Sequence, residues 1–158
     1  MNDSPSTECL VCRKHSGEVD VPGGVIYEDN LIYISHAQLW GGEKEHYLGH
    51  VFVESRRHIA EVSDLTEKEA QVIGVYTSRI ARALLYTEKM EHIYIFVIGD
   101  GVPHVHYHVI GRYPGAPRAY WGSKVDDWPK APKGDAAEIK KVADRLRIYL
   151  REHFVDKQ

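Results

Sequence analysis

The sequence predicts an α+β fold, with an antiparallel sheet of about five strands, a central helix and a C-terminal helix. Short stretches of β-favouring residues, several of them alternating apolar with polar positions, are joined by hairpin-like links, which favours antiparallel pairing. Two longer stretches repeat apolar residues at the helical period. The chain has 158 residues, of which 43% are hydrophobic. We therefore expect one domain over residues 1–158, large enough to bury a core.

The N-terminal part of the chain predicts an irregular segment followed by three strands. Residues 1–23 contain two cysteines and no clear periodicity. A hairpin follows, with strands at 25–27 and 31–35 around a Glu-Asp-Asn turn. After a loop, the sequence YLGHVFVES at 47–55 alternates as a further strand does.

The central helix is predicted within residues 65–88. Thr66 and Glu69 have the spacing of a capping box, in which the two side chains satisfy the first unpaired N–H groups of a helix. One face then follows the helical repeat through Ala70, Ile73, Thr77, Ile80 and Leu84. This is the clearest helix in the sequence.

The second half of the chain predicts two strands, an irregular segment and the last helix. The two strands lie within 92–112 and are separated by a Gly-Asp-Gly turn. Residues 112–134 are rich in proline, glycine and aromatic residues, and a structureless stretch of this length is uncommon unless it is disordered or functional. The final helix is predicted over 135–154, with Asp135 as N-cap and Glu138 three residues later.

Composition and charge argue against several classes of function. The formal charge of −3 gives no electrostatic reason to expect a general nucleic-acid or membrane-surface binder. The N-terminal sequence has no apolar segment typical of a secretory signal, and no run approaches the ~18–20 apolar residues of a membrane span. Two cysteines are too few for a disulfide framework. These features together predict a cytoplasmic, reduced setting.

Three alternating histidines carry the strongest chemical signal. The sequence PHVHYHVIGR places His104, His106 and His108 at every second position, with β-favouring residues between them. In a strand the three imidazoles would share one face. Three solvent-facing histidines would be an unusual choice there, since histidine is not a preferred strand residue. Two chemical interpretations remain open: shared metal ligation, or an imidazole nucleophile assisted by its neighbours.

The pattern resembles the histidine triad (HIT) family. Residues 104–110 match its alternating His-φ-His-φ-His-φ-φ signature at every position, where φ is apolar or aromatic. The sequences VIYEDN at 25–30 and GHVFVESRRH at 49–58 resemble further blocks of the family in the same order. The resemblance implies a nucleotide-binding α+β fold, a homodimer, and hydrolysis or transfer of nucleoside monophosphate groups.

The resemblance also implies roles for individual residues. His106 would attack the α-phosphorus and form a nucleotidyl-histidine intermediate, and His108 would lie near the phosphate and the leaving group. Turn amides at Asp100, Gly101 and Val102 would help to bind phosphate oxygens. The substrates implied are dinucleoside polyphosphates and nucleoside phosphoramidates. The chain departs from the family where YISHAQ at 33–38 has no carboxylate to hold ribose hydroxyls.

The cysteine pair Cys9-Leu10-Val11-Cys12 has the spacing of zinc ligands, but zinc needs two more. Some HIT proteins complete such a site with histidines that correspond to His58 and His104. The resemblance therefore implies a zinc-containing CxxC type with a structural zinc on Cys9, Cys12, His58 and His104. Two other histidines are competing candidates for the third ligand: His50 and, less favoured, His15.

The sequence thus predicts a HIT-type nucleotide hydrolase or nucleotidyl transferase. Two alternatives stay open: a metallohydrolase whose catalytic metal is held jointly by the three triad histidines, and a zinc-braced nucleotide-binding or scaffold protein without turnover. The irregular segment contains Trp121 and Trp128, which either cover apolar surface or fold over the active site. The remaining histidines are expected to be ordinary surface or core-edge residues: His36, His46, His92 and His153.

Overall fold

An antiparallel five-stranded sheet forms the centre of the protein, which is described here from a computed structural model over residues 5–154. Its strands lie in the order β1 (Val25–Glu28), β2 (Ile32–His36), β4 (His50–Ser55), β6 (His106–Arg112) and β5 (His92–Phe96). The predicted α+β class and the expected number of strands in this sheet are confirmed.

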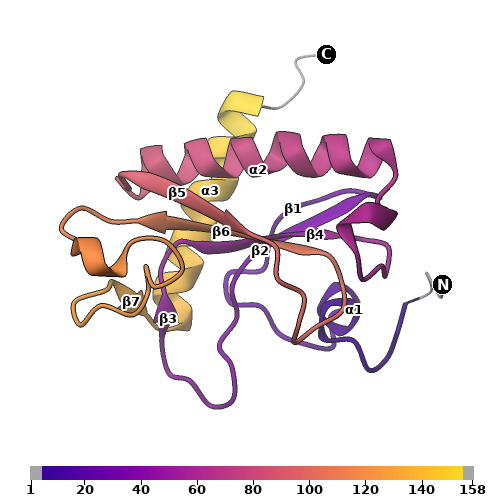
Figure 1. The fold of residues 1–158 in the computed structure, drawn as a ribbon, viewed down its shortest axis with the longest axis horizontal. Coiled ribbons are helices and arrows are strands. Elements are labelled where there is room, and N and C mark those ends of the chain that lie inside the picture. Colours follow the sequence, from indigo (N-terminus) through magenta and orange to yellow (C-terminus); the bar gives the residue numbers. More distant parts are fainter. Residues whose placement is uncertain (1–4, 155–158) are drawn as a thin grey trace.

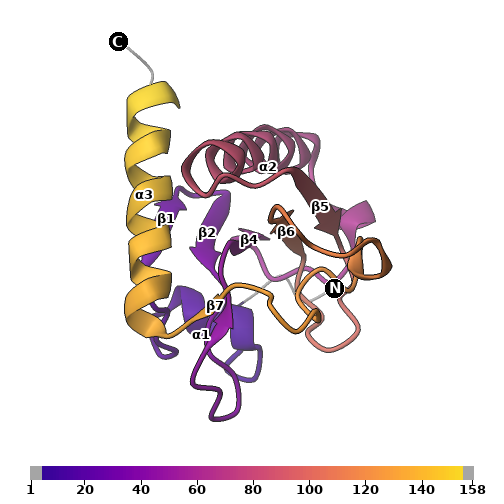
Figure 2. The ribbon, with the colours of Figure 1, turned by 90° about the vertical axis from the view of Figure 1, so that its left-hand side faces the viewer.

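Two long helices pack on one face of this sheet, as Figures 1 and 2 show. They are α2 (Glu67–Thr87) and α3 (Ala136–Phe154). The opposite side carries a short helix, α1 (Leu10–His15), and a small second sheet. That sheet pairs β3 (His46–Tyr47) with β7 (Lys133–Gly134). Two single 3₁₀ turns, Val62–Asp64 and Arg118–Tyr120, complete the described elements.

Strand alternation separates the core from the face that carries the histidines. Val51 and Val53 of β4 and Val109 of β6 are fully buried in the core under the two long helices. The residues between them point the other way, because neighbours along a strand alternate between faces. On that other face Glu54 lies opposite His106 and Phe52 lies opposite His108 across the β4–β6 pair. The sheet thus gives the two histidines a rigid support.

Both predicted helix caps are present. The Thr66 hydroxyl accepts from the Glu69 amide while the Glu69 carboxylate accepts from the Thr66 amide. A two-point contact with Arg57 also holds this carboxylate, lowering the pKa of Glu69 to about 2. At α3, Asp135 and Glu138 exchange the same pair of bonds. The expected face of α2 is buried at Ile73, Thr77, Ile80 and Leu84, whereas Ala70 is exposed.

The structure also differs from the expected boundaries of several elements. The segment 1–23 is not irregular throughout, because α1 forms within it. The expected strand at 47–55 is divided at Gly49, whose φ of +85° favours glycine. In addition, β6 begins at His106, so that His104 precedes the strand instead of lying within it.

Among residues 5–154, no helix is both long and apolar enough to cross a bilayer.

Candidate active site and metal centre

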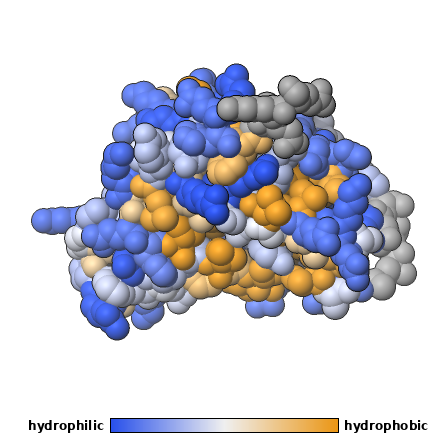
Figure 3. Space-filling view, turned by 90° about the horizontal axis from the view of Figure 1, so that it is seen from above, coloured by the Kyte–Doolittle hydropathy of each residue, from blue (hydrophilic) through white to orange (hydrophobic). Residues whose placement is uncertain are grey.

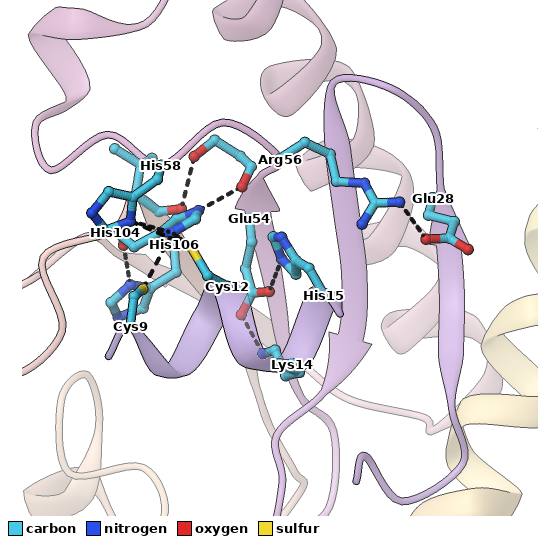
Figure 4. A network of polar contacts seen from close by, with 12 residues as sticks. Cys9, Cys12, Lys14, His15, Glu28, Glu54, Arg56, His58, His104 and His106 are labelled. Carbon is cyan, nitrogen blue, oxygen red and sulfur yellow. Dashed lines mark hydrogen bonds and ion pairs between the residues drawn. The ribbon is translucent and has the colours of Figure 1, made fainter. Parts of the chain in front are cut away.

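Four side chains from three separate segments converge in front of the sheet (Figure 4). They are Cys9 and Cys12, around the start of α1, His58 after β4, and His104 before β6. Their ligand atoms all lie within 4.8 Å of one another. These are the four residues that the sequence predicts as metal ligands, and they form a possible metal-binding group.

The distances within this group fit a tetrahedral zinc ion. Zn–S bonds of about 2.3 Å and Zn–N bonds of about 2.0–2.1 Å give sulfur–nitrogen separations of about 3.6 Å and a nitrogen–nitrogen separation of about 3.3 Å. Nδ1 of His104 lies 3.5 Å from Sγ of Cys9 and 3.6 Å from Sγ of Cys12. Nδ1 of His58 lies 3.4 Å from Sγ of Cys12 and 3.3 Å from Nδ1 of His104. The residues present therefore fit the metal.

The protonation of two of these side chains bears on metal binding. Burial is the main cause that raises the pKa of the Cys12 thiol, and the nearby Cys9 raises it further, so the thiol would have to lose its proton to a bound cation. Burial likewise lowers the pKa of His104 to about 4, which keeps its imidazole neutral at pH 7. Nε2 of His104 lies 2.6 Å from the Ser55 carbonyl oxygen and donates to it, which leaves Nδ1 as a lone-pair ligand.

His106 presents a free ring nitrogen beside this group. Its Nδ1 lies 2.5 Å from the carbonyl oxygen of His104. A carbonyl only accepts hydrogen bonds, so Nδ1 carries the proton and Nε2 keeps a lone pair. The ring is half-buried and stands edge-on to Phe52, with ring centroids 5.7 Å apart. This arrangement fixes which nitrogen of the ring carries the lone pair, as a nucleophile or a general base requires.

His108 stands next to His106 on the same face, with ring centroids 5.1 Å apart. Burial, followed by the charge of His106, lowers the pKa of His108 to about 4. Its Nδ1 lies 3.0 Å from Nε2 of His50. His50, considered above as a zinc ligand, therefore bonds to the triad instead.

Two hollows open at the two histidines. The first is lined by His106 and by Asp100, together with neighbouring residues of the loop between β5 and β6 and of the segment 60–62. Asp100 and Gly101 are exposed, whereas Val102 borders a separate small hollow that also touches His106. The predicted phosphate-binding turn thus borders His106.

The second hollow joins His108 to the irregular segment 112–134. It is lined by His50 and Phe96 on the sheet and by Ser123, Val125 and Asp126 of that segment. The segment therefore reaches the active-site face. Of its two tryptophans, Trp128 is buried, and Trp121 stacks on the guanidinium of Arg112, whose Cζ lies 3.6 Å from the ring centroid.

A wider cavity between β1, α2 and α3 is lined by no histidine or cysteine.

A buried ionic cluster beside His106 was not predicted. Glu54, 1% exposed, accepts from Nζ of Lys14 and bonds to Nε2 of His15 at 2.9 Å. Burial alone would raise the pKa of Glu54, but Lys14 and His15 outweigh it and lower the pKa. His15 is thus bonded to Glu54 and lies outside the metal group. The sequence contained a signal for this cluster, because Glu54 alternates with Phe52 and His50 on the strand that pairs with the triad strand.

Two further histidines differ from the ordinary roles expected for them. His36 is fully buried, and its Nε2 accepts from the Gly49 amide at 2.9 Å. This bond fixes the turn that leads into His50. His46 lies with its Nε2 3.1 Å from Nδ1 of His50. His92 and His153 are exposed, as expected.

The geometry argues against a single metal ion bound by all three triad histidines. Nδ1 of His104 faces the cysteines, and its Nε2 bonds to the Ser55 carbonyl. Neither nitrogen is left for an ion shared with His106 and His108. Of the triad, His104 therefore belongs to the metal group, whereas His106 and His108 lie at the hollows.

Comparison with known proteins shows similarity to one family and to solved structures of the same fold. Residues 18–115 match the sequence profile of the HIT domain family. A zinc-bound histidine triad family protein from Mycobacterium smegmatis superposes with a TM-score of 0.67 at 20% identity, over 92% of this chain and 96% of that one. A hypothetical histidine triad nucleotide-binding protein from Sulfolobus tokodaii gives a TM-score of 0.71 at 15% identity, over 95% and 99%. Comparison with curated protein sequences gives no match.

Proposed function

The chain belongs to the HIT domain family, and on this premise we propose that it is a nucleotide hydrolase or nucleotidyl transferase acting at the α-phosphate of a nucleotide conjugate. The observation that carries the proposal is His106, whose Nδ1 is tied to a carbonyl while its Nε2 is free at a hollow. Dinucleoside polyphosphates and nucleoside phosphoramidates are the proposed substrate classes.

In the first step the lone pair on Nε2 of His106 attacks the α-phosphorus. The new N–P bond forms as the bond to the leaving group breaks, and that group takes the electron pair. A phosphate leaving group departs as an anion, whereas an amine takes a proton from water, and the proton released in the second step neutralises the hydroxide that this leaves. The His104 carbonyl, 2.5 Å from Nδ1, stabilises the positive charge that develops on the His106 ring.

In the second step water attacks the phosphorus of the nucleotidyl-histidine. A new O–P bond forms, and the N–P bond breaks with its electron pair returning to Nε2 of His106. The water proton goes to Nε2 of His108, whose low pKa keeps it neutral and able to accept at pH 7. Amides of the turn at Asp100, Gly101 and Val102 bind phosphate oxygens. Another acceptor in place of water would make the protein a transferase.

We further propose that zinc occupies the group formed by Cys9, Cys12, His58 and His104. Four protein ligands leave no open position, so the metal's role would be structural. It would fix the segment that leads into β6, and with it the carbonyl on which His106 depends. Thiolate ligands need reduced cysteines, which suits the cytoplasm.

The test is a panel of dinucleoside polyphosphates and nucleoside phosphoramidates, with release of nucleoside monophosphate measured by chromatography. We expect turnover of at least one class. Tight nucleotide binding without any product would contradict the enzyme proposal and favour the binding protein instead.

We also propose a homodimer formed through the open edge of the sheet. β5 pairs only with β6, and Ile95, Val97 and Ile98 on and beyond it are 49%, 43% and 62% exposed. Figure 3 shows hydrophobic side chains gathered in a band across the face of the molecule that is seen from above. Apolar residues at a free edge are typical of an interface.

Sedimentation velocity tests the dimer. We expect the wild-type protein to sediment as a dimer and Ile95→Lys as a monomer. The matched control is Ile148→Lys, since Ile148 on α3 is 48% exposed on a different element. A wild-type monomer, or equal dissociation of both variants, would contradict this interface.

A further inference from the structure

A chain of hydrogen bonds leads from the triad to the surface. Nδ1 of His108 lies 3.0 Å from Nε2 of His50, and Nδ1 of His50 lies 3.1 Å from Nε2 of His46. Nδ1 of His46 in turn lies 3.3 Å from a carboxylate oxygen of Glu43. Three imidazoles from β6, β4 and β3 are thus joined end to end, with a carboxylate at the outer end.

The carboxylate gives the chain a direction. An ionised carboxylate only accepts, so Nδ1 of His46 carries a proton, and in the neutral ring its Nε2 is an acceptor. Nδ1 of His50 then donates to that acceptor, and Nε2 of His50 accepts from Nδ1 of His108. The remaining nitrogen, Nε2 of His108, is left with a lone pair. This is the atom to which the proposed hydrolysis delivers a proton.

Burial and charge oppose a proton resting at the inner end. Burial lowers the pKa of His50 well below its usual value, and the imidazoles of His108, His46 and His36 and the ammonium of Lys14 act in the same direction. The outer end is different, because the side chains of His46 and Glu43 are 15% and 45% exposed. A proton on the inner rings is therefore disfavoured, whereas the outer end of the chain is within reach of solvent.

We propose that His46 and Glu43 are positioning residues of the reaction, forming the outer half of a proton relay that runs from His108 through His50 to solvent. The inference rests on the proposed function above. His46 and Glu43 touch no reacting atom; they act by fixing the tautomers of His50 and His108 and by taking up the proton.

Each step of the relay moves one proton between neighbouring groups. Water gives a proton to Nε2 of His108, and the Nδ1 proton of His108 passes to Nε2 of His50. The Nδ1 proton of His50 passes to His46, and that of His46 passes to the Glu43 carboxylate, which releases it to bulk water. No electrons are gained or lost. The reverse shift, after the product has left, restores the starting tautomers.

The first measurement needs no turnover. Long-range ¹H–¹⁵N NMR of the histidine-labelled protein reports which ring nitrogen carries the proton. We expect the Nδ1–H tautomer at His46, His50 and His108 in the wild type. In His46→Phe we expect His50 and His108 to lose this preference, and in the control His153→Gln to keep it. A wild type without these tautomers would overturn the relay, even if the enzyme is active.

The second measurement separates the two chemical steps by rapid quench. In His46→Gln the amide oxygen can still accept from Nδ1 of His50, but an amide cannot pass a proton on. We expect intermediate formation to keep its wild-type rate and intermediate hydrolysis to slow by about 10- to 100-fold, below the ~10²–10⁴-fold of a direct acid–base group. Glu43→Gln should slow the same step.

Other kinetic results overturn the relay. Unchanged hydrolysis in His46→Gln would remove its role, and equal slowing of both steps would show general damage instead. If the wild type forms no intermediate with any substrate, the proposed function fails and the relay's role fails with it. The NMR result then still shows whether the hydrogen-bonded chain exists, so the two failures are distinguishable.

Discussion

Replacing His106 with alanine is expected to lower kcat/KM for nucleotide hydrolysis by about 10⁴-fold or more, since the variant lacks the nucleophile on which both steps depend. Within residues 5–154 the ring makes one hydrogen bond, to the His104 carbonyl, and it is half-buried on the face of the sheet opposite the two long helices. Its loss should therefore leave the fold intact. Release of nucleoside monophosphate from the best substrate of the panel provides the measurement.

Controls for this variant separate chemistry from folding. Circular dichroism and thermal unfolding should match the wild type, and nucleotide affinity should fall by less than tenfold. His153→Gln alters a distant exposed histidine on α3 and should leave turnover unchanged. A folded His106→Ala protein that retains a tenth or more of wild-type turnover would contradict the role of His106.

Replacing Cys12 with serine is expected to abolish zinc binding and to lower the free energy of unfolding by roughly 4 kcal/mol or more, the range reached when a metal site is lost. Cys12 contributes the sulfur that lies within 3.6 Å of both imidazole ligands. Without it, three ligands remain around a buried site. Zinc content by atomic emission and denaturant unfolding measure the two effects.

Removal of the metal with a chelator distinguishes a structural zinc ion from a catalytic one. Loss of a structural ion should inactivate the enzyme only as fast as the N-terminal segment detaches, whereas removal of a catalytic ion stops turnover as soon as the ion leaves. Ser16→Ala is a control near the cysteines, since Ser16 ends α1 outside the metal group. Zinc-free wild-type protein with unchanged stability would contradict the structural role.

Much of the fold and part of the site follow from local sequence signals. The capping boxes at Thr66 and Asp135 act within one helical turn, so a short window of sequence contains the whole cause. The spacing of Cys9 and Cys12 is equally local. The pairing of that dyad with His58 and His104, by contrast, came from resemblance to a family, because the partners lie 46 and 92 residues from Cys12.

Other parts of the site depend on register, which no short window contains. His46 and His50 are four residues apart in the sequence, but their link to His108 requires β4 to pair with β6 in one register. The cluster of Lys14 and Glu54 likewise requires α1 to dock on the sheet. The position of His104 outside β6 also escaped prediction, since alternation continues through it although the strand does not.

In the proposed reaction, catalysis proceeds through a nucleotide bound covalently to His106. The most direct test is intact-protein mass spectrometry after rapid quenching of enzyme and substrate in alkaline denaturant, which preserves N–P bonds. We expect one nucleoside monophosphate added per active site, mapped to His106, accumulating in His46→Gln and absent from His106→Ala. Efficient turnover with no adduct in any variant, or an adduct on another residue, would contradict it.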